Sequence, residues 1–145
     1  MKLINGSNET FEIKITGYHF KNSVNRGYNS DWLNVSLILK NDSETFVKFL
    51  RFLVIEEIER MQDWFKNILE KNIQLRELDF IDPCFRLKLM NRSGIQVIKF
   101  MYETDEKNRG VWEMNANNIN IQIVLDELQL MLIKYPCRCG EKHTK

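Results

Sequence analysis

Residues 84–102 read CFRLKLMNRSGIQVIKFMY, and this stretch decides the class of fold. Its first half, Cys84–Met90, alternates apolar and polar side chains with the period of a half-buried strand. The second half, Ile95–Tyr102, returns as a strand. Between them Asn91-Arg92-Ser93-Gly94 predicts a turn, because glycine adopts a positive φ without steric cost. The sequence therefore predicts a β-hairpin here.

Other segments extend this pattern towards the N-terminus. Trp32–Lys40 and Thr45–Leu53 flank a polar turn and predict a second hairpin. Phe11–Tyr18 also alternates, and Gly17 is predicted to end or bend that strand. Shorter strands are predicted over residues 75–80 and 111–114. The polar residues 21–31 and 103–110 are predicted to be loops.

Two segments have the period of a helix. Apolar residues recur at spacings of three and four in residues 55–71, which predicts an amphipathic helix with one core-facing side. Residues 119–123 alternate like a strand, but the longer series Ile121, Leu125, Leu128, Leu132 and Tyr135 favours a second helix. Asn117 or Asn118 is expected to cap that helix, and Pro136 to end it.

The order of these elements predicts an α+β fold. Neighbouring hairpins form antiparallel sheets, and the two helices do not alternate with strands as in a βαβ protein. The chain of 145 residues is the length of one domain. We expect a single α+β domain over residues 1–136, with antiparallel sheet built from hairpins and two amphipathic helices packed on it. Residues 137–145 are expected to be a C-terminal tail.

Charge and cysteine content narrow the classes of function. The 21 Lys and Arg residues against 20 Asp and Glu residues give a net charge of +1, without the basic excess usual in nucleic-acid binders. No apolar run approaches the ~20 residues that a membrane-spanning helix needs. An odd count of three cysteines does not suit a secreted disulfide scaffold. A cytoplasmic protein is expected.

The C-terminus contains the residues most suggestive of a metal site. Cys137, Cys139 and His143 are potential zinc ligands, but a structural zinc site needs four ligands, and Cys84 is the remaining cysteine. The sequence contains no phosphate loop and no oriented nucleophile-base pair. We therefore expect no catalytic residues and no cofactor, and keep a small-ligand or metal-binding module as the alternative function.

Several segments taken in order resemble one family. They are Phe11–Phe20, Asp31-Trp32-Leu33, the helix with Glu57-Ile58 and Trp64-Phe65, then Leu78–Phe85, and finally Tyr135–Arg138. Together they are similar to the WapI-type immunity proteins of bacteria, from Phe11 to Arg138. The resemblance implies a cytoplasmic antitoxin-like protein that binds the C-terminal domain of a cognate exported toxin. It further implies that the toxin domain is a nuclease acting on tRNA, inhibited by occlusion and without chemistry from the immunity protein.

The same resemblance directs attention to exposed residues as the toxin-binding surface. Loops carry recognition residues because they tolerate change, so the loops at residues 21–31 and 103–109 are the first candidates. A nuclease that handles tRNA presents a basic surface, and acidic residues would complement it. The predicted partner-binding residues are Asn29, Asp31, Glu56, Glu57, Asp63, Glu103, Asp105 and Glu106. Salt-dependent binding of RNA by the isolated protein would instead indicate a nucleic-acid binder.

Overall fold

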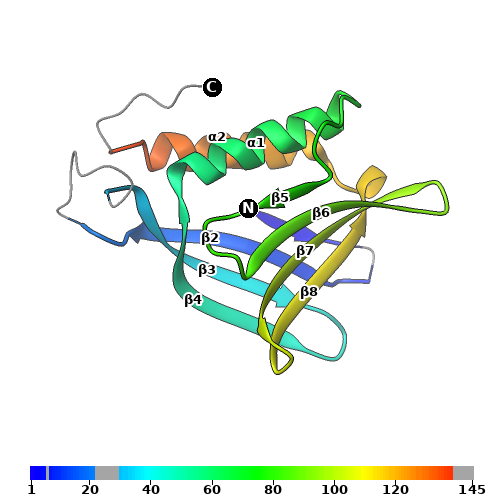
Figure 1. The fold of residues 1–145 in the computed structure, drawn as a ribbon, viewed down its shortest axis with the longest axis horizontal. Coiled ribbons are helices and arrows are strands. Elements are labelled where there is room, and N and C mark those ends of the chain that lie inside the picture. Colours follow the sequence, from blue (N-terminus) through cyan, green and yellow to red (C-terminus); the bar gives the residue numbers. More distant parts are fainter. Residues whose placement is uncertain (6, 22–29, 139–145) are drawn as a thin grey trace.

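The computed structural model describes residues 1–5, 7–21 and 30–138 of the chain. Figure 1 shows the strands in two crossing groups with both helices above them. The elements in chain order are β1 (Lys2–Ile4), β2 (Thr10–Tyr18), β3 (Trp32–Lys40), β4 (Thr45–Val54), α1 (Ile55–Leu69), β5 (Glu77–Asp79), β6 (Phe85–Arg92), β7 (Ile95–Asp105), β8 (Asn108–Asn115), a 3-10 turn (Ala116–Asn118) and α2 (Ile121–Lys134).

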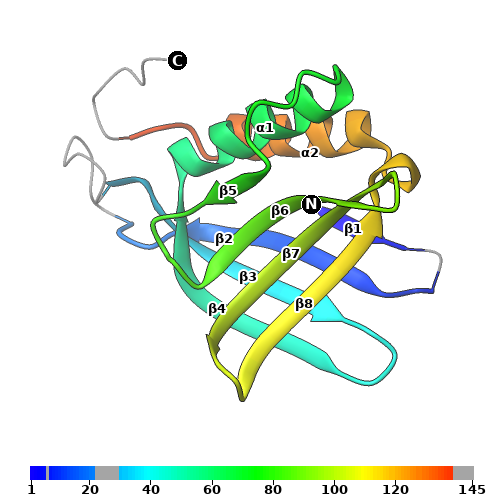
Figure 2. The same ribbon diagram turned by 45° about the vertical axis from the view of Figure 1, so that its right-hand side comes forward.

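The strands form two four-stranded sheets in simple sequence order, β1-β2-β3-β4 and β5-β6-β7-β8. Every pairing is antiparallel. The two sheets cross face to face, and α1 and α2 lie side by side over one end of this sandwich (Figure 2). The structure confirms the predicted α+β class with its two helices and hairpin-built sheets.

The hairpin that decides the fold is present, with a tighter turn than predicted. β6 extends to Arg92 and β7 begins at Ile95, so only Ser93 and Gly94 connect them. Both residues have positive φ, 53° and 84°, as in the turns that match the twist of paired strands. The Asn91 side chain accepts a hydrogen bond from the Gly94 amide at 2.9 Å. Gly17 likewise lies at a bulge in β2, which confirms the predicted bend.

The prediction of a loop over residues 103–110 is wrong. β7 continues to Asp105 and β8 begins at Asn108, so this polar stretch forms the tip of a hairpin. The Asp105 carboxylate accepts hydrogen bonds from the amides of Lys107 at 2.8 Å and Asn108 at 2.9 Å. Asp and Asn close turns through such bonds, and pairing across the hairpin overrides the polar composition. The short strand β1 was not predicted.

The C-terminal segment is a helix, as the longer apolar series predicted, but its cap differs. Asn120 accepts the hydrogen bond of the Ile123 amide at 3.2 Å and is the N-cap of α2. Asn117 and Asn118 instead belong to the preceding 3-10 turn, which is capped by Asn115. The chain first makes this tight turn, so α2 begins later than the sequence predicted.

Aromatic rings join the two sheets to each other and to α1. Phe11 of β2 and Phe100 of β7 have ring centroids 3.8 Å apart. Trp112 of β8 packs on both, and Phe65 of α1 lies 6.4 Å from Phe100. All four side chains are buried. Large aromatic rings contribute more buried area than any other side chains, so this cluster is the centre of the core.

Glu57 links the start of α1 to the other sheet. Its carboxylate accepts hydrogen bonds from the amide of Val54, at the end of β4, at 2.9 Å, and from the amide of Ile81, which follows β5. The side chain is only 1% exposed. The first amides of a helix have no partner within it, and Glu57 supplies one for Val54.

We expect Glu57→Ala to lower the free energy of unfolding by roughly 1–3 kcal/mol, because two amides lose their acceptor in a buried place. Urea unfolding followed by tryptophan fluorescence measures this. Glu59→Ala, the same change on a half-exposed side chain of the same helix, is the control and should have a much smaller effect. Equal effects of the two substitutions would contradict this role of Glu57.

The Glu57 carboxyl is also expected to make the stability of the fold depend on pH. Burial raises the pKa of Glu57 above its ordinary value of 4.5, against the opposing hydrogen bonds from Ile81 and Val54. At pH values between the pKa of Glu57 in the unfolded state and its raised pKa in the folded state, the folded protein holds a proton that the unfolded chain has lost. The stability of the fold therefore falls as pH rises through this range. The stability of wild type minus that of Glu57→Gln should therefore decrease as pH rises above 4.5. A pH-independent difference would contradict the assignment.

Candidate functional site

The acidic residues predicted at the β7–β8 hairpin are exposed, and local groups compensate two of them. Glu103 pairs with Arg109 at 3.6 Å across the hairpin. The pKa of Asp105 is lowered by hydrogen bonds, first from the Asn108 side chain and then from the Lys107 and Asn108 amides. Glu106 lies at the turn between the strands. The hairpin tip is therefore acidic, but part of its charge is already engaged.

Asp31 is fully buried, so its predicted place on an exposed loop is wrong. Its carboxylate accepts hydrogen bonds from the Cys137 thiol at 3.0 Å and the Arg138 amide at 2.6 Å. The guanidinium of Arg138 lies 4.1 Å from the Tyr18 ring centroid and donates to the Phe20 carbonyl at 3.1 Å. The segment after α2 folds back over the ends of β2 and β3, which removes Asp31 from solvent. Asn29 lies outside the described residues.

Of the predicted metal ligands Cys137, Cys139 and His143, the structure describes Cys137. Cys137 is half-buried and its thiol faces Asp31. Cys139 and His143 lie outside the described residues. Across residues 1–5, 7–21 and 30–138, no group of three or more His, Cys, Asp and Glu side chains could hold a metal ion. The metal site stays a prediction, because the structure does not describe two of its three residues.

The acidic residues of α1 separate into three environments. Glu57 is buried, so the prediction that it is exposed is wrong. Its carboxylate is held inside the fold because it accepts hydrogen bonds from the amides of Val54 and Ile81. Glu56 is half-buried in the first turn. Asp63 is exposed on the outer side of the helix, as predicted. Of this predicted set, Asp63 is the residue best placed for contact with a partner.

Asp63 belongs to a mixed surface at the C-terminal half of α1 that the sequence did not predict. Leu75 is exposed there by 61%. With the polar residues beside it, it makes the α1 contact surface, defined here as Asp63, Asn67 and Leu75. Exposed apolar side chains rimmed by polar ones are typical of interaction sites. Leu75, an apolar residue within a polar connection, was the signal in the sequence that could have indicated this surface.

The connection after α1 is held against the helix. Trp64 donates a hydrogen bond from its indole nitrogen to the Leu75 carbonyl at 3.0 Å. Asp63, Asn67 and Leu75 line a small hollow of about 150 Å³ on this side. The hydrogen bond fixes the backbone that presents Leu75, so the exposed leucine has a defined position.

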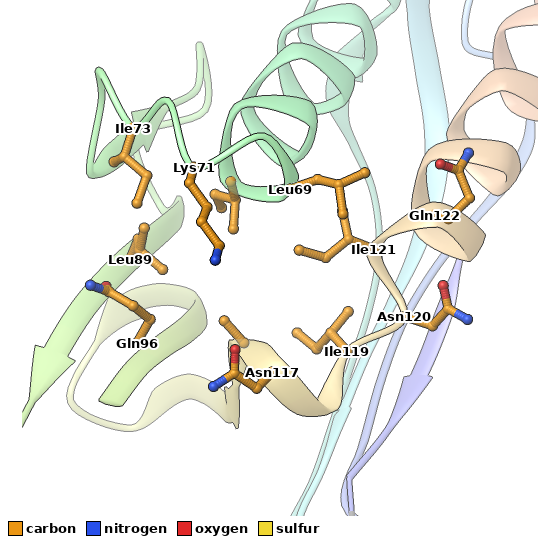
Figure 3. Close-up of a pocket in the computed structure, with 12 residues that line it drawn as sticks. Leu69, Lys71, Ile73, Leu89, Gln96, Asn117, Ile119, Asn120, Ile121 and Gln122 are labelled. Atoms are coloured by element: carbon orange, nitrogen blue, oxygen red, sulfur yellow. The ribbon is translucent and has the colours of Figure 1, made fainter. Parts of the chain in front are cut away.

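A larger cavity of about 570 Å³ opens at the end of α1 (Figure 3). Leu69 and Lys71 come from α1 and its end, Ile73 from the connection that follows, and Leu89 and Gln96 from the β6–β7 hairpin. The remaining wall comes from the 3-10 turn and the start of α2. The Lys71 side chain extends into the cavity in Figure 3. Ligand-binding cavities commonly span ~300–1,000 Å³, so this one is of binding size.

Lys71 has an unusual backbone that results from how α1 ends. The Asn72 amide donates to the Asn67 carbonyl at 2.9 Å, and the Lys71 amide to the Ile68 carbonyl at 3.2 Å. These two bonds make a Schellman motif, in which the residue at the position of Lys71 is usually glycine. Lys71 has φ 56°, in the left-handed region. A residue with a Cβ atom is less favourable than glycine in this conformation.

The fold and this surface define a small α+β protein suited to contact with another protein. The family comparison agrees: the model of the WapI-like immunity protein family matches residues 2–136, and the chain belongs to that family. Membership implies the role of an immunity protein, which binds a cognate toxin. Searches of curated proteins and of solved structures found no match. No helix in the described residues is long and apolar enough to cross a membrane.

The strain at Lys71 predicts an asymmetric pair of substitutions. Lys71→Gly should raise the free energy of unfolding by roughly 0.5–1 kcal/mol, because glycine adopts a positive φ without the clash of a Cβ atom. Lys71→Ala keeps the Cβ and should change stability little. Thermal unfolding of both variants measures the difference. Stabilisation by alanine as large as that by glycine would show that the charge, and not the backbone, is responsible.

Proposed function

We propose that this protein binds the C-terminal toxin domain of a cognate exported bacterial toxin and inhibits it by occlusion. The observation that carries the proposal is the family match over residues 2–136. Exposed Leu75, with Asp63 and Asn67 beside it on the α1 contact surface, supports binding to a protein, since interfaces combine apolar contacts with a polar rim. The immunity protein supplies no chemistry of its own.

The toxin domain is, in this proposal, a nuclease that acts on tRNA, and inhibition takes place in the cytoplasm. A protein that handles tRNA needs a basic surface, because phosphate contacts dominate nucleic-acid affinity. Acidic groups of the immunity protein then complement that surface. Asp63 lies beside exposed Leu75 on the α1 contact surface, whereas two acids of the β7–β8 hairpin already have local partners. The α1 contact surface is therefore the proposed docking site.

The size of the protein suits this role. A standard interface buries about 800 Å² on each partner. The accessible surface of the described structure is 8601 Å², so such an interface would cover about a tenth of it. One face of the protein is enough to block a toxin active site.

Growth rescue with a binding assay tests the proposed function. The candidate toxin domain, encoded beside this gene, is expressed with and without the protein, and the two are then co-purified. Rescue together with a stable complex is the expected outcome. Cleavage of tRNA in extracts identifies the activity of the toxin. Toxicity without rescue and without a complex would refute the proposed function, and a toxin that leaves tRNA intact would refute its nuclease part.

A pair of charge reversals locates the contact. Asp63→Lys should weaken toxin binding about tenfold or more, since like charges meet across the interface. Glu106→Lys makes the same change at the β7–β8 hairpin and should leave the affinity unaltered. Titration calorimetry at low and high salt measures both, and the loss should shrink as salt rises. The opposite ranking would move the contact to the β7–β8 hairpin.

A further inference from the structure

We propose that the large cavity at the end of α1 receives an apolar side chain of the toxin, and that Lys71 pairs with a carboxylate next to that side chain. This inference rests on the proposed function and deepens it, because it names the chemistry of the toxin segment. The partner is thus an acidic residue adjacent to an apolar one, in a segment exposed on the toxin domain.

The walls of the cavity provide the apolar part of the site. Isoleucine and leucine side chains from four parts of the fold line it: Ile68, Leu69, Ile73, Leu89, Ile119 and Ile121. Leu69 and Ile73 are still partly exposed. Filling a preformed apolar cavity removes this surface from water, which favours binding. Pockets of this kind hold the anchor residues that dominate binding energy at interfaces.

The charge of the residues around the cavity indicates which charge its partner should carry. Of the described residues that line it, Lys71 alone is charged. Within the described part of the chain, the ion pairs do not include Lys71. The fold accepts a strained backbone, with φ 56°, at the residue that places this amine in the cavity. An uncompensated cation beside apolar walls is complementary to a carboxylate beside an apolar group.

The rim of the cavity favours a polypeptide over a small molecule. Four residues with amide side chains line it: Gln96, Asn117, Asn120 and Gln122. Three of these side chains already bond within the fold, Gln96 with Arg76, Asn120 with the Ile123 amide and Gln122 with Asp126. An amide side chain has several donor and acceptor sites, and those that are left match the alternating groups of a peptide backbone. These features fit a toxin segment that enters with one side chain and lies across the rim.

Substitutions of Lys71 separate its charge from its backbone. Lys71→Asn removes the charge while asparagine tolerates the left-handed conformation, so it should weaken toxin binding about tenfold or more without loss of stability. Lys71→Gly should weaken binding equally although it stabilises the fold. Lys71→Arg should bind within a few-fold of wild type. Calorimetry with the toxin domain measures all three. Binding by Lys71→Asn equal to wild type would overturn the role of Lys71.

A second variant tests the cavity itself. Asn117→Trp fills the cavity from its rim and should weaken toxin binding, whereas Asn118→Trp, one residue along and outside the lining, should not. Thermal unfolding verifies that both variants fold. Equal affinity of the two variants would overturn the cavity as an anchor site. Wild type that fails to bind the toxin domain would instead refute the proposed function and this inference together, so the two failures are distinguishable.

A charge exchange identifies the toxin residue. Lys71→Glu should lose binding, and one Asp→Lys or Glu→Lys substitution in the toxin should restore it only for that variant. If Lys71 had only a structural role, no such rescue would occur, and a lack of rescue would refute the carboxylate partner.

A small ligand is the competing occupant of the cavity, and decanoate, a small apolar carboxylate, is the probe for it. Tight decanoate binding combined with unaltered toxin binding by Lys71→Asn would assign the cavity to a small ligand and overturn the proposal.

Discussion

The contact between Phe11 and Phe100 is the interaction on which the other elements depend. No strand ladder joins the two described sheets, so side-chain packing must hold them together, and these rings are 3.8 Å apart. Gly110 allows β8 to lie close to β3 and β4 of the other sheet, because a Cβ atom there would lie 2.6 Å from atoms of Leu39 and Phe46. Phe65 packs α1 on the same cluster. The aromatic centre therefore sets where the helix, and with it the α1 contact surface, can lie.

Both ends of α1 are held by specific bonds, which gives the proposed interface a rigid base. Glu57 connects the first turn to the amides of Val54 and Ile81. The Schellman bonds end the helix and turn Lys71 towards the cavity. A preorganised surface loses less entropy on binding than a flexible one. An immunity protein that works by occlusion needs this property, because its only means of inhibition is the stability of the complex.

The sequence predicted the local elements well and the functional surface poorly. The boundaries of β3 and the bend at Gly17 follow from side-chain alternation and from the freedom of glycine, which are local properties. The hairpin at Asp105 was predicted as a loop, because cross-strand pairing is not visible in composition. Asp31 was predicted to be exposed, but a segment more than a hundred residues away covers it.

The sequence by itself determined the fold class and the family, because periodicity and the order of short segments are written along the chain. Tertiary structure alone decided which acids are buried, which leucines are exposed and which residues share the cavity at the end of α1. The physical reason is that burial and proximity depend on packing between distant elements. Lys71 shows the division: its charge is a fact of sequence, but its strained backbone and its place in the cavity arise from how α1 ends against the rest of the fold.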